Sequence, residues 1–384
     1  MRILIALTYY RPHVSGLTIY AQRLAQGLAQ RGHTVTVLTS RFNPTLPVRE
    51  REMDGVEIVR VPVAASVSKG VIMPLFPFYA ATFIRRHDVV NAHMPQFEAA
   101  LLAGLGRTMR RGVVLTYQCD LSMPPGWLNR VVETSLAPLN EAAARLAHSI
   151  VVTTADYAEH SPFLTRHQAK LAVIPTLINT PVPEPARSEQ LARRWGLEGA
   201  VTIGFAARFA AEKGVEYLLE ALPRVAREVP NVRIAFTGAY KYTVGEQAYL
   251  KHLEPLIAAQ RERLVFLDLL SDDEMANFFS VCDVLAVTSL NSTESFGLVQ
   301  VESMLCGTPV VATDLPGVRE AVRRTGMGLI VAPRDPAALA DALVRVIRER
   351  AQFQRPRAAI IAEFNLDAAL EQYEQVFAQS RLSA

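Results

Sequence analysis

The sequence predicts an α/β protein made of two Rossmann-like domains, each with a doubly wound parallel sheet. Three observations lead to this prediction. The chain has 384 residues, which is long for a single hydrophobic core. Short apolar runs rich in β-branched residues alternate with helical patterns, as in successive βαβ units. Both halves begin with a strand, a glycine-bearing loop and a helix, at residues 3–25 and 202–222.

The predicted strands are continuously apolar rather than alternating. That pattern is typical of parallel strands covered by helices on both faces. In the first half the strands are expected at 2–7, 34–39, 56–61, 88–92, 112–116, 149–153 and 171–174. In the second half they are expected at 201–206, 232–237, 264–267, 283–287, 309–313 and 328–331.

Helical patterns fill the intervals between these strands. Residues 20–32 carry an apolar stripe that stops at Gly32, and residues 215–230 carry another that ends before Pro230. Residues 175–188 contain four prolines and little apolar content, so we expect a linker there. The predicted domains are 1–178 and 179–360, followed by an amphipathic helix within 361–384. Because ligands bind at the carboxyl ends of parallel strands, two facing sheets imply one cleft between the domains.

Composition excludes several classes of protein. Half of the residues are apolar, 20% are charged and the net charge is +3, so we expect no nucleic-acid partner. Three cysteines without a CxxC pair fit a reducing cytoplasm and argue against a zinc or disulfide scaffold. The longest apolar run, 71–84, is broken by Pro74 and Pro77 and is too short to span a bilayer. We therefore predict a cytoplasmic protein.

Several common motifs are absent from the sequence. It contains no GxGxxG, no P-loop, no HExxH and no GxSxG, which removes the simple dinucleotide, NTPase, zinc-protease and serine-hydrolase interpretations. Asp272 and Asp273 are predicted to cap a helix rather than to bind a metal. We expect no metal site and no cofactor.

Glycine and cationic residues follow predicted strands. Gly16 starts a helix after the first strand, where backbone N–H groups can approach a phosphate; a plain turn glycine is the alternative. Arg208 and Lys213 follow the strand at 201–206. Such a pair suits a diphosphate, with Arg as a bidentate fork and Lys as a point charge; a solvated helix start is the alternative.

Two glutamates, Glu294 and Glu302, lie at the edge of a predicted core. Glu294 is expected in a loop, and a helix is expected to start at residues 295–297 and to contain Glu302. Apolar neighbours leave Glu302 little exposed room, so its carboxylate needs hydrogen-bond donors, and a diol supplies two. The first N–H groups of this helix, at Gly297 and Leu298, can meet a phosphate. Capping and ion pairing remain the alternative.

Together these residues resemble the retaining glycosyltransferases of the GT-B fold, the group 1 or family 4 class. That class has a Glu-x7-Glu motif, matched here by Glu294 and Glu302 within ESFGLVQVESMLCGTPVVAT. The similarity extends from YYRPHVSG to GLIVAPRDPAALADAL and is stronger in the C-terminal half. It implies an acceptor-binding N-terminal domain, a nucleotide-sugar-binding C-terminal domain and a final helix that packs back on the first domain.

The resemblance also implies a role for each donor-binding residue. Glu302 would bind the ribose hydroxyls and Glu294 the donor sugar, while Arg208 and Lys213 would hold the diphosphate as catalytic cations. Backbone groups near the sugar and phosphates would come from Phe296, Gly297 and Leu298. The backbone of Leu270 would bind the base, and Gly16 would approach the diphosphate.

The acceptor side departs from the family pattern. Gln118 stands where the family often has histidine, and glutamine cannot act as a base; any acceptor role for Gln118 is therefore limited to hydrogen bonding. Asp120, two residues later, is a second acceptor candidate. His93 matches another frequent family histidine that faces the cleft and is a candidate catalytic residue. A structural histidine at a strand end is the alternative.

The predicted activity is transfer of a sugar from a nucleotide diphosphate donor, such as a UDP-sugar or GDP-mannose, to an acceptor hydroxyl. The anomeric configuration would be retained by front-face attack, without a metal. The acceptor is a sugar, lipid or small molecule, as in cell-envelope glycan synthesis. A nucleotide-sugar epimerase or glycoside phosphorylase is the alternative on the same fold, and a two-domain ligand-binding protein is the alternative from another class.

The charge distribution and the apolar run at 71–84 are relevant to whether the protein binds a membrane. Residues 1–174 carry a net charge of about +7 and the remainder about −4. With the arginines at 85–86 and 107–111, this pattern is consistent with peripheral docking of the N-terminal domain on anionic lipid. A buried helix with a solvated arginine face is the alternative.

Overall fold

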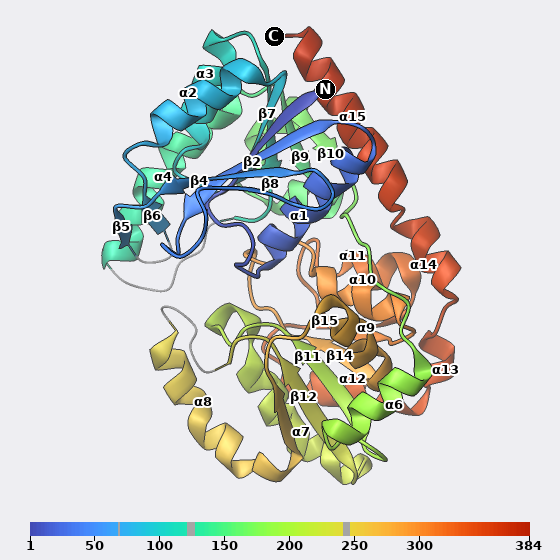
Figure 1. Cartoon of the computed structure of the whole chain (residues 1–384). Helices are drawn as coiled ribbons and strands as arrows, with labels where there is room; N and C mark the ends of the chain where they lie inside the picture. Colours follow the sequence, from blue (N-terminus) through green and yellow to red (C-terminus); the bar gives the residue numbers. More distant parts are fainter. Residues whose placement is uncertain (68–69, 121–126, 241–245) are drawn as a thin grey trace. The chain divides into compact units, whose positions relative to one another are not determined.

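The computed structural model describes residues 1–67, 70–120, 127–240 and 246–384, and Figure 1 shows the course of the chain. The chain divides into two units. Unit 1 comprises Met1–Leu177 and Asn365–Ala384, and unit 2 comprises Ile178–Phe364. The chain thus leaves unit 1 at Leu177 and returns to it at Asn365.

Unit 1 is built on an eight-stranded sheet with the order β10-β9-β8-β7-β1-β2-β4-β3. Its neighbouring strands run parallel, apart from the antiparallel pair β3 and β4. The strands are β1 (Arg2–Ala6), β2 (Thr34–Arg41), β3 (Arg49–Arg51), β4 (Glu57–Pro62), β7 (Val89–Met94), β8 (Gly112–Tyr117), β9 (Ser149–Val152) and β10 (Leu171–Val173). A separate antiparallel pair consists of β5 (Ala65–Val67) and β6 (Gly70–Ile72).

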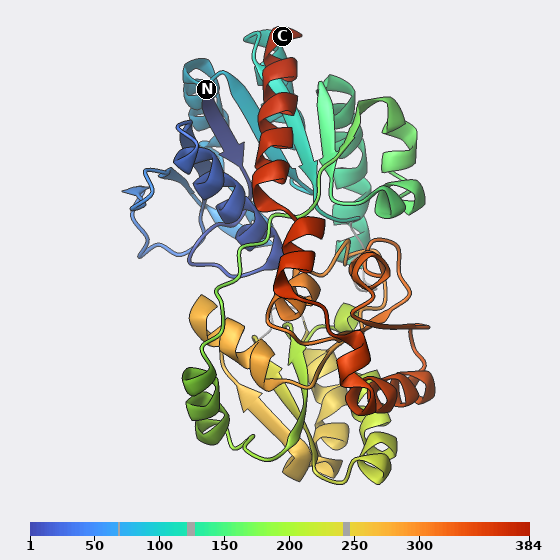
Figure 2. The same cartoon turned by 90° about the vertical axis from the view of Figure 1, so that its right-hand side faces the viewer.

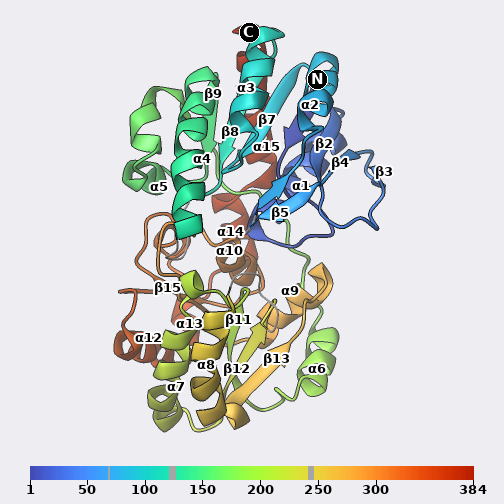
Figure 3. The ribbon, with the colours of Figure 1, turned by 90° about the vertical axis from the view of Figure 1, so that its left-hand side faces the viewer.

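Helices cover both faces of this sheet, as the two side views show (Figures 2 and 3). On one face α1 (Gly16–Gln30) and the C-terminal α15 (Leu366–Leu382) close one core cluster. On the other face a second cluster is closed by α2 (Phe76–Arg86), α3 (Ala99–Thr108), α4 (Trp127–Leu146) and α5 (Ala155–His160). The 3-10 helix η1 (Leu164–Lys170) leads into β10.

Unit 2 is built on a six-stranded parallel sheet with the order β13-β12-β11-β14-β15-β16. These strands are β11 (Val201–Ala206), β12 (Val232–Thr237), β13 (Leu264–Leu267), β14 (Val284–Val287), β15 (Val310–Thr313) and β16 (Gly328–Val331). Both sheets therefore confirm the predicted α/β class, and every strand expected from an apolar run is present within a residue or two of its predicted bounds.

The helices of unit 2 also lie on two faces. One core cluster is closed by α7 (Val215–Glu228), α8 (Gln247–Ala259) and α12 (Pro336–Arg348). The other is closed by α9 (Asp272–Val281), α10 (Leu298–Leu305), α11 (Glu320–Thr325) and α14 (Arg357–Glu363). The shorter elements are α6 (Pro185–Arg194), η2 (Ala211–Lys213), η3 (Arg261–Arg263) and α13 (Arg350–Phe353).

Two details differ from the sequence prediction, and the start of the first helix confirms it. The strands β3, β5 and β6 were not predicted, because each has three residues and β3 reads Arg-Glu-Arg, without an apolar residue. The first helix begins at Gly16, as predicted, with Ser15 as its N-cap. Asp272 and Asp273 lie in the first turn of α9, and the cap is Ser271, whose side chain accepts a hydrogen bond from the Glu274 N–H.

Each sheet has one point where the strand order reverses. In unit 2 the chain proceeds from β11 outward through β12 and β13, then returns to β14 on the other side of β11. In unit 1 the corresponding neighbours are β1 and β7. Ligands of open parallel sheets bind beyond the carboxyl ends of the strands at such a point. A ligand-binding site is therefore expected in the loops after β11 and β14 in unit 2 and after β1 and β7 in unit 1.

Candidate functional site

In unit 2 the loops after β11 and β14 are held against each other at Gly214. This residue has a φ of 62° and ends η2 while capping α7. A Cβ here would collide with the carbonyl oxygen of Thr288, so only glycine allows this approach. The Thr288 hydroxyl donates to the carbonyl of Lys213 at 2.7 Å. The two loops are thus fixed relative to each other.

This arrangement brings Lys213 to Glu294, 81 residues later in the chain. Their side chains form an ion pair, and each is about 20% exposed. Arg208, on the same loop as Lys213, pairs with Glu212. Both cations and Glu294, predicted from sequence as site residues, therefore lie at the switch point of unit 2. Glu212 was not predicted; its place beside Lys213 in AAEKG is the signal that could have indicated it.

The start of α10 provides backbone N–H groups beside this pair. Gly297 caps the helix with a φ of 78°, and no side chain of the described residues caps the N-terminal N–H groups. A Cβ on Gly297 would lie 2.9 Å from Nε2 of Gln300. That amide is already committed, because it donates to the carbonyls of Phe296 and Val318. The Phe296 side chain lies in the core, so only its backbone faces the loop.

Glu302 lies one turn along α10 and is 8% exposed. Its charge reaches the neighbouring thiol of Cys306, whose pKa is raised to about 12, chiefly by burial and further by Glu302. Leu270 is partly buried in the loop between β13 and α9. A hollow of about 660 Å³ in unit 2 lies elsewhere, between α8 and β13, and none of the predicted residues lines it.

In unit 1 Gly16 is the first residue of α1, at the end of the loop that follows β1. Its N-cap Ser15 forms a capping box with Thr18. A Cβ on Gly16 would meet no atom within 4 Å, and its φ is not in the left-handed region. Neither packing nor backbone conformation within the described chain therefore requires glycine here.

His93 lies on β7, one residue before its carboxyl end, and is 1% exposed. The fold thus buries the ring, which favours the structural histidine given above as the alternative to a histidine that faces a ligand. Burial lowers the pKa of His93 to about 3, so the imidazole is neutral at physiological pH. Nδ1 lies 3.4 Å from Nε2 of Gln118, and Nε2 has no hydrogen-bond partner among the described residues.

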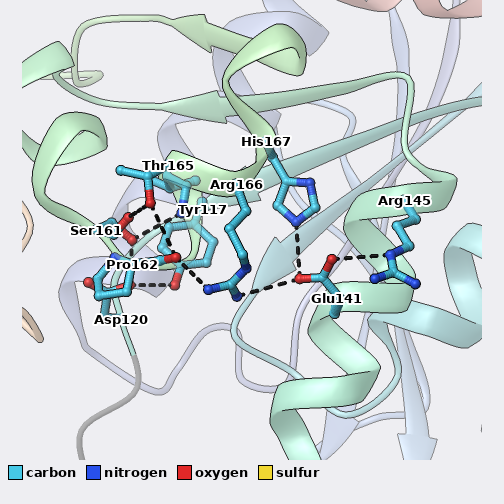
Figure 4. Close-up of polar contacts among 10 residues, drawn as sticks. Tyr117, Asp120, Glu141, Arg145, Ser161, Pro162, Thr165, Arg166 and His167 are labelled. Carbon is cyan, nitrogen blue, oxygen red and sulfur yellow. Dashed lines mark hydrogen bonds and ion pairs between the residues drawn. The ribbon is translucent and has the colours of Figure 1, made fainter.

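Asp120, just after β8, is held by hydroxyl groups (Figure 4). Tyr117 and Ser161 each donate to its Oδ1 at 2.7 Å. Its main-chain N–H donates to the hydroxyl of Tyr157 at 2.6 Å. The three hydroxyl residues were not predicted from sequence, since Tyr157 and Ser161 lie about 40 residues from Asp120 and have no motif of their own.

Comparison with known proteins identifies the family. The family described as "Glycosyl transferase 4-like domain" matches residues 15–176, and the family described as "Glycosyl transferases group 1" matches residues 200–349. Together they span most of the chain.

Relatives that are similar over most of their length are named as glycosyltransferases. The 2-deoxystreptamine glucosyltransferase of Streptomyces kanamyceticus is 28% identical over 94% of this chain and 98% of its own. The D-inositol 3-phosphate glycosyltransferase of Acidothermus cellulolyticus is 28% identical over 96% of this chain and 87% of its own.

Solved structures share the fold. Sucrose-phosphate synthase from Thermosynechococcus elongatus superposes with a TM-score of 0.81 and 22% identity over 100% of both chains. Anabaena HepE, solved with UDP and glucose, superposes with a TM-score of 0.78 and 22% identity over 99% of this chain and 100% of its own. The chain belongs to the group 1 glycosyltransferases, enzymes of the GT-B fold.

Proposed function

We propose that this chain transfers a glycosyl group from a nucleotide diphosphate sugar to an acceptor hydroxyl, with retention of the anomeric configuration and without a metal ion. The observation that carries the proposal is the Lys213–Glu294 ion pair beside the uncapped start of α10. A cation, a carboxylate and free main-chain N–H groups offer separate partners for the phosphates and the sugar hydroxyls.

Each candidate site residue of unit 2 has a distinct role in this proposal. Lys213 and Arg208 leave their carboxylate partners, wholly or in part, and bind the diphosphate. Glu294 then accepts hydrogen bonds from the donor sugar, and the buried Glu302 accepts them from the ribose hydroxyls. The N–H groups of Gly297 and Leu298 bind a phosphate oxygen, while the Leu270 backbone contacts the base.

The proposed reaction breaks the bond between the anomeric carbon and the diphosphate oxygen, and the electron pair leaves with the diphosphate. The acceptor oxygen forms the new bond on the same face of the sugar. Its proton passes to the departing phosphate oxygen. Lys213, Arg208 and the α10 N–H groups stabilise the negative charge that develops on the diphosphate, which is the largest contribution expected of such a site. His93 takes no part as an acid or base.

The donor nucleotide is proposed to be uridine diphosphate. Structures of HepE were solved with UDP, with UDP and glucose, and with UDP-glucose, and HepE shares the fold of this chain. UDP-glucose is therefore the first donor to test, followed by ADP-glucose and GDP-mannose.

The decisive variant is Lys213→Ala. Release of nucleoside diphosphate from the three donors is measured with and without acceptor, and we expect turnover to fall roughly 100-fold or more. Lys251→Ala is the matched control, because Lys251 is an exposed lysine on α8 and should keep full turnover. Turnover of Lys213→Ala within a few fold of the wild type would remove Lys213 from the mechanism.

Product analysis separates the proposed transfer from the alternatives on this fold. A transferase joins the sugar to an acceptor, and the proton NMR coupling of the product reports whether the configuration is retained. An epimerase converts the donor without any acceptor, and a phosphorylase requires inorganic phosphate. Full activity after treatment with EDTA is expected, and its loss would contradict metal independence.

Unit 1 also exposes apolar side chains near the start of α2, namely Ile72 at the end of β6, the N-cap Leu75 and Phe78 in the first turn. These side chains are 50%, 47% and 72% exposed, and Arg85 and Arg86 lie exposed at the other end of the same helix. No helix among the described residues is long and apolar enough to cross a membrane. We propose that this surface docks on an anionic bilayer, with the aromatic ring inserted and the arginines near the headgroups.

Co-sedimentation with vesicles tests this docking. We expect binding to phosphatidylglycerol-containing vesicles at low salt, weaker binding at high salt, and loss of binding in Phe78→Ser. Equal recovery in the supernatant with charged and neutral vesicles would contradict the proposal.

A further inference from the structure

The Asp120 carboxylate of unit 1 has one oxygen fully engaged and one without a partner. Both side-chain donors, Tyr117 and Ser161, bind Oδ1. Oδ2 is shielded from solvent and has no hydrogen-bond partner among the described residues. Asp120 as a whole is only half-buried, so a ligand that binds Oδ2 displaces the atoms that cover this oxygen. The two hydroxyls therefore fix the plane of the carboxylate and leave Oδ2 to accept from another molecule.

The surrounding hydroxyls are neutral and do not offset the charge of Asp120. Burial raises the pKa of Tyr117 and of Tyr157, and the negative charge of Asp120 raises both further. Both phenols therefore stay protonated at physiological pH. Tyr117 is held in place by its ring, which stacks on Phe163 with centroids 4.8 Å apart.

Nearby cationic groups are engaged elsewhere. Arg166, the closest in sequence to Ser161, donates to the carbonyl of Pro162 at 2.5 Å and pairs with Glu141 (Figure 4). Glu141 also binds His167 and Arg145. No ion pair joins Asp120 to a cation within the described ranges. A carboxylate oxygen that is desolvated and unbalanced in this way favours a cationic partner over a neutral one.

We propose that Asp120 Oδ2 binds an ammonium group of the acceptor, so that the acceptor class is an amino-bearing polyol, with Tyr117 and Ser161 as positioning residues. This inference rests on the proposed transferase function. The names of two relatives contain an amino-bearing and a phosphate-bearing compound: they are a 2-deoxystreptamine glucosyltransferase and a D-inositol 3-phosphate glycosyltransferase. The inference favours an acceptor of the first kind. A phosphate at Oδ2 would meet like charge, whereas an ammonium group would be attracted and would donate the missing hydrogen bond.

Three probes with the same six-carbon ring test the charge preference. They are 2-deoxystreptamine, which carries ammonium groups at neutral pH, the neutral myo-inositol and the anionic D-inositol 3-phosphate. Affinity for the full chain is measured by titration calorimetry with UDP present. We expect 2-deoxystreptamine to bind at least tenfold more tightly than myo-inositol, and the phosphate to bind most weakly. Equal affinities, a preference for the phosphate, or no binding by any probe would overturn the proposal.

Variants then assign the preference to Asp120. Asp120→Asn keeps the shape of the side chain and removes its charge, so we expect it to abolish the tenfold preference. Tyr117→Phe and Ser161→Ala should raise the KM for 2-deoxystreptamine about threefold to tenfold while kcat changes little, because they only loosen the carboxylate. Thr165→Val is the control, since the Thr165 hydroxyl donates to the carbonyls of Ser161 and Pro162 but not to Asp120.

Slow hydrolysis of UDP-glucose without acceptor separates this inference from the proposed function. Hydrolysis depends on the donor residues of unit 2 and is measured in the wild type and in the control Thr165→Val, which should keep the wild-type rate. If the wild type neither binds UDP nor turns over any nucleotide sugar, the proposed function fails. If it turns over UDP-glucose but Asp120→Asn keeps the wild-type preference among the three probes, the acceptor inference alone fails. Wild-type melting temperatures for the variants establish that they are folded.

Discussion

At the scale of single residues, Gly297 combines a backbone requirement with a place in the candidate donor site. Its φ of 78° lies in the left-handed region, which costs an alanine about 1–2 kcal/mol. Gly307, at the other end of α10, has a similar φ of 83°, but a Cβ there would meet nothing within 4 Å. The two glycines therefore separate strain from crowding.

We predict that Gly297→Ala and Gly307→Ala are both destabilised by the cost of a left-handed alanine. Only Gly297→Ala should also weaken UDP binding. The added methyl group would press on the Gln300 amide and shift the N–H groups at the start of α10. Urea unfolding gives the stability of both variants, and calorimetry gives their affinity for UDP. Equal UDP affinities in the two variants would mean that the α10 start does not contact the nucleotide.

His93 makes stability depend on pH. Its pKa is about 3 in the folded state and about 6.5 in an unfolded chain. Below pH 6.5 the unfolded chain binds a proton that the folded chain does not. The stability contributed by the neutral ring is therefore complete above pH 6.5 and is lost as the pH falls toward 3.

We predict that this residue accounts for about 2 kcal/mol of the stability lost between pH 7 and pH 5. Urea unfolding of His93→Gln at the two pH values should show a correspondingly smaller loss. His160→Gln is the control, because His160 is half exposed. In this variant the difference in unfolding free energy between pH 7 and pH 5 should be the same as in the wild type. A full wild-type difference in His93→Gln would show that its ring titrates normally in the folded chain.

The chemistry of individual residues was partly predictable from sequence. The pattern around Glu294 and Glu302 indicated them as candidate donor-binding residues, because a carboxylate in an apolar helix, as at Glu302, is unusual without a partner. The pairing of Lys213 with Glu294 was not predictable, since it depends on β11 and β14 being neighbours. The hydroxyls around Asp120 were missed for the same reason, and the burial of His93 follows from packing by α1 and α15 that no local pattern reports.

At the scale of elements, α15 completes the core of unit 1 with residues from the far end of the chain. The hydroxyl of Tyr373 bonds that of Tyr20 on α1 at 2.8 Å and that of Thr116 on β8 at 3.3 Å. Tyr20 and Tyr373 are fully buried, and Phe377 lies in the same cluster. The sequence indicated an amphipathic helix here, but its buried polar contacts depend on long-range packing.

We predict that Tyr373→Phe destabilises unit 1 by about 1–2 kcal/mol, because it leaves the buried Tyr20 hydroxyl short of a partner. The double variant Tyr20→Phe with Tyr373→Phe should lose less than the sum of the two single variants, since neither hydroxyl then remains. Thermal or urea unfolding of the four proteins completes the cycle. Strictly additive losses would mean that the two hydroxyls do not interact.

At the scale of the whole molecule, the two units have separate cores. Two of the described core clusters lie within unit 1 and two within unit 2. The two large sheets and their parallel strands were predictable, because these strands are continuous apolar runs, whereas β3 and the separate β5–β6 pair were not. The predicted bounds at 178 and 360 lie one and four residues from the points where the chain leaves unit 1, after Leu177, and leaves unit 2, after Phe364.

This division predicts two transitions in calorimetric unfolding of the intact chain. UDP should raise the midpoint temperature of only one of them. Under the proposed function UDP binds residues of unit 2, and at 100 times its dissociation constant it stabilises that unit by about 2.7 kcal/mol. For a unit of this size the midpoint should rise by roughly 5–10 °C. Variants assign the transitions, because Gly297→Ala should lower the one that UDP raises and Tyr373→Phe should lower the other. A single transition would mean that the units unfold as one cooperative body, and a rise of only the midpoint that Tyr373→Phe lowers would place the nucleotide on unit 1.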